Sequence, residues 1–401
     1  MSDHINNVNE AEVLNEGNAP APEEESVVAP EVEEKEIKVS VIIPIYNACR
    51  YIRPALDSVI SQTLQEIEII CVDDGSTDTS LDMLKIYQKQ DSRIRIITKT
   101  NGGPALARNN GLARARGEYV AFLDADDFCE IDMLEKLYNR AKIDDLDIAI
   151  GNYDIYNNKK ARFQQSVDSD YGSIYKGGAV TSKNEYPDYI LQSTTGAAWN
   201  KLFKRSFLES NGILFLTDVM VFEDVFFTAS ALAFAEKVAR IDDVVMHHRI
   251  YSSQSRARLF KKNYHQVPEA FVRIKEFLMR GGMYQPLSNG FLNLSASRCY
   301  HVFNLLKSDA KENFFNILHE EYCDKLGWSE HVAEDYQKSE ICEFTANVAM
   351  YTFDQFEKRN KRGMKLKKEQ IDYKLKVNNR RKRIREFFGR IFSKKDKKEN
   401  K

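Results

Sequence analysis

The pattern of apolar and polar residues changes abruptly near residue 38. From there to residue 153, short apolar stretches alternate with stretches of helical spacing, beginning with KVSVIIPIY at residues 38–46. Apolar stretches of this length are typical of buried strands. Strands that alternate with helices indicate a mostly parallel sheet covered by helices on both faces. We therefore predict an α/β fold for this part of the chain.

The individual elements can be placed from the same pattern. Strands are expected at residues 38–46, 67–74, 94–99, 118–127 and 146–153, with helices between them at 50–62, 80–90, 105–116 and 131–142. Residues 154–198 are polar, rich in tyrosine and irregular, which suits a loop region near a site. Helical spacing returns at 197–208 and 221–237, and residues 238–251 indicate one or two further strands.

Three regions flank the α/β domain, which we expect to cover residues 38–259. Residues 1–37 carry eleven acids against one Lys and few large apolar residues, so we expect a disordered acidic tail. Residues 260–357 have helical spacing throughout, and this region either holds an acceptor or mediates self-association, giving a homo-oligomer. Residues 358–401 form a basic tail with twenty Lys and Arg against five acids.

The basic tail contains a narrow apolar stripe. The stripe recurs at helical spacing within RRKRIREFFGRIFSKK, as Ile384, Phe387, Phe388, Ile391 and Phe392. A basic helix with such a stripe is typical of binding to an anionic membrane surface. The alternatives are a nucleic-acid-binding tail and a solvated tail, and the paired Phe residues disfavour both. We therefore expect a membrane partner and no nucleic acid.

Other features of the sequence bear on where in the cell the protein is located. No signal peptide and no apolar run of about 18 residues is visible, so neither secretion nor a membrane span is expected. The six cysteines are scattered without CxxC pairs, which indicates free thiols in a reducing compartment. We predict a cytoplasmic protein that is peripheral on the inner face of the cell membrane.

Polar residues follow three of the predicted strands, and two of these strand ends are rich in acids. PIYN closes the first strand, VDDGSTD the second, and LDADD the fourth. The carboxyl ends of parallel strands lie along one rim of a sheet, where ligands bind. Crowded carboxylates repel one another, and their hard oxygens suit Mg²⁺ or Mn²⁺ bound together with substrate phosphates. The sequence therefore predicts a divalent metal site at this rim.

Four segments carry a more specific resemblance. VSVIIPIYN, ICVDDGSTD, NGGPALARNNGLARARGEYVAFLDADD and FEDVFF together resemble the family two inverting glycosyltransferases with the GT-A fold, of the bacterial cell-surface polysaccharide type. The resemblance covers residue 38 to about residue 255. It implies a nucleotide-diphosphate sugar as donor, most often UDP-linked, and a glycan or lipid-linked acceptor.

The resemblance implies roles for residues near the nucleotide. It assigns nucleotide binding to Pro44, Tyr46, Asp74, Arg108 and Asp124. Tyr46 would pack against the base, Asp74 would bind its edge, and Asp124 would bind the ribose. The alternative for Asp74 is a cap on the next helix, a role that suits Ser76 or Asp78 better. The alternative for Arg108 is a structural arginine that faces the sheet.

The resemblance also implies a metal ligand and parts of a sugar pocket. Asp126 would bind the metal, and Asp127 would either orient the turn or help with the metal. His248 stands where the family often carries Tyr, and it either completes the metal shell or only packs. Arg249 would pair with the diphosphate. Trp199, in WNKLFKR, forms either a pocket wall or part of the core.

The resemblance places the catalytic base in the pair Glu223–Asp224. In a single displacement, the acceptor hydroxyl attacks the anomeric carbon opposite the leaving diphosphate, and a carboxylate takes the hydroxyl proton. We assign Asp224 as this base and place Glu223 against the acceptor. The alternative is that both are helix-start acids favoured by the helix dipole.

Two other functions compete with this interpretation. A nucleotidyltransferase would need a glycine-rich basic phosphate loop early in the chain, and PIYNACRYI is not one. A membrane or nucleic-acid adaptor with an inert GT-A domain would not need the intact DADD and FED motifs. We therefore predict an inverting, metal-dependent glycosyltransferase.

Overall fold

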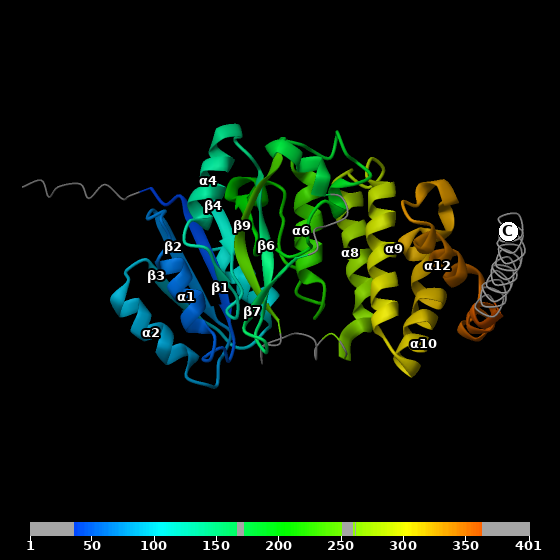
Figure 1. Ribbon diagram of the computed structural model, residues 1–401, viewed down its shortest axis with the longest axis horizontal. Helices are drawn as coiled ribbons and strands as arrows, with labels where there is room; N and C mark the ends of the chain where they lie inside the picture. Colours follow the sequence, from blue (N-terminus) through cyan, green and yellow to red (C-terminus); the bar gives the residue numbers. More distant parts are fainter. Residues whose placement is uncertain (1–35, 167–171, 251–259, 261, 363–401) are drawn as a thin grey trace, which may run out of the picture. The chain divides into compact units, whose positions relative to one another are not determined.

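A mixed sheet forms the centre of the fold (Figure 1). The computed structural model describes residues 36–166, 172–250, 260 and 262–362. Within these residues the sheet has nine strands, and its main path runs in the order β3 (Ile94–Thr98), β2 (Ile67–Asp73), β1 (Val39–Ile45), β4 (Tyr119–Phe122), β8 (Lys201–Lys204), β6 (Ile148–Asn157), β9 (Val238–Ile250) and β5 (Phe128–Cys129). Strand β7 (Arg162–Gln165) pairs with β6 beside this path.

The first four strands of this order form the parallel part of the sheet. Strand β1 pairs in parallel with β2 on one side and with β4 on the other, and β3 pairs in parallel with β2. The carboxyl ends of β1, β2 and β4 therefore lie next to one another. This arrangement confirms the predicted α/β fold and brings the three strand-end motifs, PIYN, VDDGSTD and LDADD, to one rim.

Helices cover both faces of the sheet because the side chains of each strand alternate between two cores. Ile42, Ile70 and Val72 belong to one buried cluster, whereas Val41 and Ile43 belong to the other. The first cluster includes α3 (Pro104–Leu112) and α6 (Glu223–Phe234), and the second includes α1 (Ile52–Ile60), α2 (Ser80–Gln90) and α4 (Met133–Asp144).

The expected helix at residues 197–208 is wrong for its first part. Residues 201–204 form β8, which is antiparallel to both β4 and β6, and only Arg205–Ser210 is helical, as α5. Leu202 belongs to one core cluster and Phe203 to the other, so the strand is buried on both faces. A short apolar run of this kind cannot be distinguished from a buried helix by its spacing alone.

The irregular region and the last strand of the domain also differ in detail from expectation. Strand β6 extends to Asn157, and β7 follows it. Short 3₁₀ turns occupy Gly172–Gly178 and Ile190–Gln192. Residues 238–250 form one strand, β9, with irregular register against β6 between Ile150 and Tyr153.

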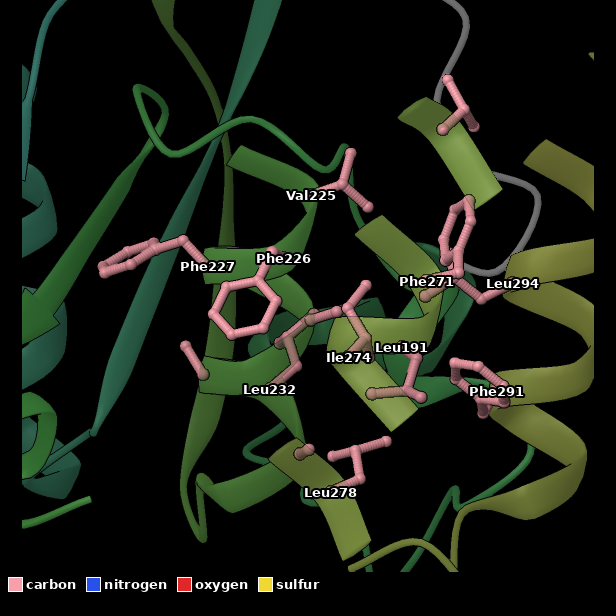
Figure 2. Packing of buried hydrophobic residues seen from close by; sticks show 14 of the residues in the cluster. Leu191, Val225, Phe226, Phe227, Leu232, Phe271, Ile274, Leu278, Phe291 and Leu294 are labelled. Carbon is pink, nitrogen blue, oxygen red and sulfur yellow. The ribbon is translucent and has the colours of Figure 1, made fainter. Parts of the chain in front are cut away.

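The C-terminal region is helical, as predicted, and shares its core with the sheet domain. Its main helices are α8 (Val267–Arg280), α9 (Ser288–Leu305), α10 (Ser308–Ile317) and α12 (Ser339–Met350). Figure 2 shows Phe226 and Leu232 of α6 in the same apolar cluster as Phe271 and Ile274 of α8. The buried core therefore continues across the boundary predicted at residue 259.

Some expectations concern residues outside this description. The acidic tail before residue 36 and the apolar stripe at residues 384–392 lie outside the described residues, so both remain predictions. Among the helices that are described, none is long and apolar enough to cross a membrane.

Candidate active site

A cavity of about 750 Å³ opens at the rim where the acidic motifs meet. Its size is typical of a small-molecule site. Ten of the twelve predicted site residues line it, namely Pro44, Tyr46, Asp74, Arg108, Asp124, Asp126, Trp199, Asp224, His248 and Arg249. The other two, Glu223 and Asp127, are buried and do not line the cavity.

Arg108 joins two distant motifs inside this site. It lies on α3 and is almost fully buried, with 4% of its surface exposed. Its guanidinium donates to Asp124 Oδ1 at 2.5 Å and to Glu223 Oε1 at 3.4 Å. A fixed guanidinium fork can hold two carboxylates in one geometry. Arg108 therefore ties the DADD turn to the first residue of α6.

Asp127 organises the other side of the DADD turn. Its carboxylate pairs with Nδ1 of His248 at 3.0 Å and accepts the backbone N–H of Arg249 at 2.7 Å. The Arg249 side chain in turn donates to the carbonyl of Asp126 at 2.7 Å. Asp127 thus fastens the end of β9 to the DADD turn.

The charges around Asp127 and His248 change how both groups titrate. Burial raises the pKa of Asp127 to about 6, although the hydrogen bond with His248 opposes this rise. Burial alone would lower the pKa of His248, but the hydrogen bond to Asp127 and the nearby acidic charges outweigh it and raise the pKa to about 9. Protein cations therefore already compensate two of the crowded acids, since Arg108 pairs with Asp124 and His248 with Asp127.

Asp74 is buried at the end of β2 and holds the loop that starts α3. Its carboxylate accepts the backbone N–H groups of Gly102 at 3.0 Å and Gly103 at 2.8 Å, and it also pairs with Lys99. Gly103 has a φ of 87°, a conformation that favours glycine. Asp74 therefore lines the cavity while fixing the backbone that leads to Arg108.

Trp199 is both a cavity wall and a core residue. It is 8% exposed, and its ring stacks on His248 with centroids 5.3 Å apart and planes at 10°. Tyr153 contacts it edge to face at 4.8 Å. Its role as the wall of a sugar or acceptor pocket stays a prediction, and the stacked ring limits the orientation of His248.

The start of α6 places Asp224 in the cavity. Phe222, the residue before the helix, has a φ of 65°, which is rare for a bulky side chain and costs about 1–3 kcal/mol. Strain of this kind persists only where surrounding contacts impose it, and the Phe222 ring packs edge to face on Phe271 at 5.8 Å. The turn leaves Asp224 lining the cavity and Glu223 buried beside Arg108.

The donor set suits a divalent cation shared with a ligand. No three or more His, Cys, Asp or Glu side chains in the described part of the chain lie close enough to hold a metal by themselves. A Mg²⁺ site usually needs only one or two carboxylates because substrate phosphates supply further oxygens. Asp126 and His248 both line the cavity, and Asp127 holds the other ring nitrogen of His248, as carboxylates do for ligating histidines.

Several residues that shape the cavity are not among the predicted site residues. Asn101, Tyr153, Thr195, Phe222 and Arg298 line it. Arg298 lies on α9, far along the chain from every predicted motif. A sequence signal existed for two of them, because Asn101 opens the NGG segment at the start of the third matching stretch and Phe222 opens FEDVFF, the fourth.

Comparison with known proteins identifies the family. A family model described as Glycosyl transferase family 2 matches residues 40–210. The putative glycosyltransferase EpsH of Bacillus subtilis (strain 168) is 32% identical over 289 residues, which cover 70% of this chain and 80% of EpsH. The chain belongs to glycosyl transferase family 2. It is therefore a glycosyltransferase, as the sequence motifs predicted.

Two further members of the comparison bear on substrate and fold. The poly(ribitol-phosphate) beta-glucosyltransferase of Bacillus spizizenii is 36% identical over 210 residues, which cover 51% of this chain and 31% of that protein. The crystal structure of S. aureus TarS 1–349 in complex with UDP has a TM-score of 0.62 at 22% identity and covers 81% of this chain and 92% of that one. The similarity of the two structures confirms the GT-A fold with a helical C-terminal region.

Proposed function

We propose that this glycosyltransferase moves a sugar from a UDP-sugar to a hydroxyl group of a glycan or lipid-linked acceptor, with inversion at the anomeric carbon. The reaction would serve the synthesis of a bacterial cell-surface polysaccharide. The UDP bound by TarS supports the donor, and the poly(ribitol-phosphate) substrate in the name of the Bacillus spizizenii relative supports a cell-surface polymer as acceptor.

The donor nucleotide would bind along the ends of β1, β2 and β4. Tyr46 is 45% exposed at the cavity, so its ring is available to the base. Asp74 would meet the base edge, and Asp124 would meet the ribose. The Arg249 guanidinium lies 4.9 and 5.1 Å from the ring centroids of Tyr156 and Phe128, contacts that would hold it ready for the diphosphate.

Asp224 would act as the general base. The acceptor oxygen forms a bond to the anomeric carbon while the bond from that carbon to the diphosphate oxygen breaks. Asp224 takes the hydroxyl proton, and UDP leaves with the bonding electrons. Asp224 lies in the first turn of α6 and lines the cavity. Glu223, held by Arg108, would position this turn; because it is buried outside the cavity, the contact with the acceptor expected from the sequence is not proposed.

Asp126 would hold a divalent cation, Mn²⁺ or Mg²⁺, and His248 would join it only after its ring has released a proton, because a ligating histidine must be neutral. The ion would supply charge compensation for the leaving diphosphate. Asp127 would keep the His248 ring oriented through its contact with Nδ1.

The contact of Arg108 with both Asp124 and Glu223 is the observation that carries this proposal. It links the nucleotide motif to the turn that places Asp224 in the same cavity. The first test is a screen of nucleotide sugars for binding and hydrolysis by the wild-type chain, with and without Mn²⁺.

The second test replaces the base. Asp224→Asn should lower transfer about 100- to 10,000-fold, the usual contribution of a general base, and leave the Kd for UDP unchanged. Asp82→Asn, at an exposed acid in the first turn of α2, is the matched control and should behave as wild type. Unchanged turnover in Asp224→Asn would exclude this residue as the base.

The basic C-terminal tail supports a location at the inner face of the cell membrane. Its predicted helix would bring the enzyme to anionic lipid without crossing the bilayer. A lipid-linked acceptor would then be confined to the same surface as the enzyme.

A further inference from the structure

A second cavity lies between the sheet and the C-terminal helices. It has a volume of about 760 Å³, similar to the first. One wall comes from β6 and β9, through Asn152 and Val244. The opposite wall comes from α9, through Ser297 and Asn304, and from Lys338 just before α12. The helices and strands that border it can be followed in Figure 1.

The lining of the second cavity is suited to a polyhydroxylated ligand. Amide and hydroxyl groups predominate, including those of Asn152, Gln192, Thr194, Ser297, Tyr300 and Asn304. The charged side chains that line the cavity nearly balance, because Arg240, Arg298 and Lys338 are accompanied by Asp242 and Glu340. Such a surface offers many hydrogen bonds to the hydroxyl groups of a ligand.

The two cavities meet at a shared boundary. Tyr153, Thr195 and Arg298 line both of them. Because Arg298 belongs to α9, a helix of the C-terminal region reaches the cavity that also holds Asp224. A molecule lying in the second cavity would therefore end beside the proposed catalytic base.

The loop at this boundary is fixed by a buried lysine. The Nζ of Lys201 donates to the carbonyls of Thr195 at 2.9 Å and Ala197 at 2.7 Å, and to Oδ1 of Asn200 at 2.8 Å. These bonds use all three donors of the ammonium group. The wall between the cavities is thus pre-organised, which lowers the entropic cost of binding a ligand across it.

We infer that the second cavity binds the acceptor glycan, with the reacting end of the chain passing Tyr153, Thr195 and Arg298 to reach Asp224. The inference rests on the proposed function for the transfer step, but glycan binding itself can be measured without any donor. It assigns the C-terminal helical region the task of holding the acceptor, one of the two roles that its sequence left open.

Saturation-transfer NMR on the full-length chain tests this binding directly. The probes are chitotetraose, cellotetraose, maltotetraose and a ribitol-phosphate tetramer. Asn304→Trp places a large ring at the exposed edge of the second cavity and should weaken binding of the recognised probe at least tenfold. Leu305→Trp is the matched control, because Leu305 is the next residue of α9, is 57% exposed and does not line the cavity.

The remaining variants separate the possible outcomes. Val244→Trp, on the opposite wall, should repeat the loss, and UDP affinity should stay unchanged in all three variants. Binding that survives in both Asn304→Trp and Val244→Trp, or no binding of any probe by the wild type, would overturn the inference. If the tetramers bind through this cavity while no nucleotide sugar is hydrolysed, the proposed donor reaction fails and the glycan site stands.

Discussion

Lys201 offers a direct test of how burial changes the pKa of a side chain near this site. It lies on β8, is fully buried, and bonds only to neutral oxygens of residues 195, 197 and 200. Burial lowers its pKa to about 7, and the charge of Asp224 only partly opposes the shift. Replacing Lys201 with Met keeps a side chain of similar length and removes the titrating group.

The direction of the pH effect follows from proton binding in the two states. Between pH 7 and 10.5 the unfolded chain keeps the Lys201 proton, whereas the folded protein has released it. The unfolded state then binds more protons, so the free energy of unfolding rises with pH. This stabilisation is fully present above the unfolded pKa and is lost as the pH falls through about 7. At about 1.4 kcal/mol per pH unit, the change from pH 7.5 to 9.0 is about 2 kcal/mol.

Urea unfolding of the wild type and Lys201→Met, followed by circular dichroism at pH 6.0, 7.5 and 9.0, measures this change. The difference between the two proteins at each pH cancels the other titrating groups. The wild type should gain about 2 kcal/mol on the variant from pH 7.5 to 9.0, and little should change below pH 6.5. A difference independent of pH would mean that the three oxygen acceptors keep the ammonium charged, and the argument from burial would be refuted.

Three further predictions concern other parts of the molecule. Gly111→Ala would place its Cβ 2.4 Å from Cγ2 of Ile42, so urea unfolding should show a loss of about 1–3 kcal/mol. Arg108→Gln should weaken UDP binding, measured by calorimetry, at least tenfold, because the two carboxylates that Arg108 joins lose a charged donor worth about 1.5–3 kcal/mol. The control is Arg114→Gln, which changes an exposed residue just after the same helix and should leave UDP binding normal. Deleting the chain after Asn378 should release the protein from anionic liposomes in a sedimentation assay, and retained binding would exclude the basic tail as the membrane anchor.

The rim of acidic motifs could be predicted because two strong rules act together. Buried parallel strands read as continuous apolar runs, and their carboxyl ends must share one edge of the sheet. The motifs after β1, β2 and β4 therefore met in the structure as expected. The argument from crowded acids to a metal ion was incomplete, however, because it left out the protein's own cations. Arg108 lies in a helix and His248 at the end of a distant strand, and their pairing with Asp124 and Asp127 depends on tertiary packing.

Strand β8 shows where the spacing of apolar residues fails to predict the secondary structure. Its four residues carry Lys at both ends and two apolar residues between them, which fits one turn of a helix equally well. Tertiary structure selects the strand over the helix, because these residues lie between β4 and β6 and pair antiparallel with both. Lys201 is tolerated there because the preceding loop turns three oxygens toward it. The spacing of apolar residues in the sequence does not predict that loop.

Helix α6 explains why catalysis and the helical region belong to one unit. Ten of its twelve residues are buried, so it is not a surface helix with one apolar stripe. Its first turn carries Glu223 and Asp224, and the rest packs between the sheet and α8 (Figure 2). Because Phe222 is held in its left-handed conformation against Phe271, the aim of Asp224 depends on α8 as well as on the sheet. An enzyme that must align an acceptor hydroxyl with the proposed base Asp224 gains from this arrangement, since α8, which contacts the turn before Asp224, belongs to the same helical region as α9, which borders the second cavity.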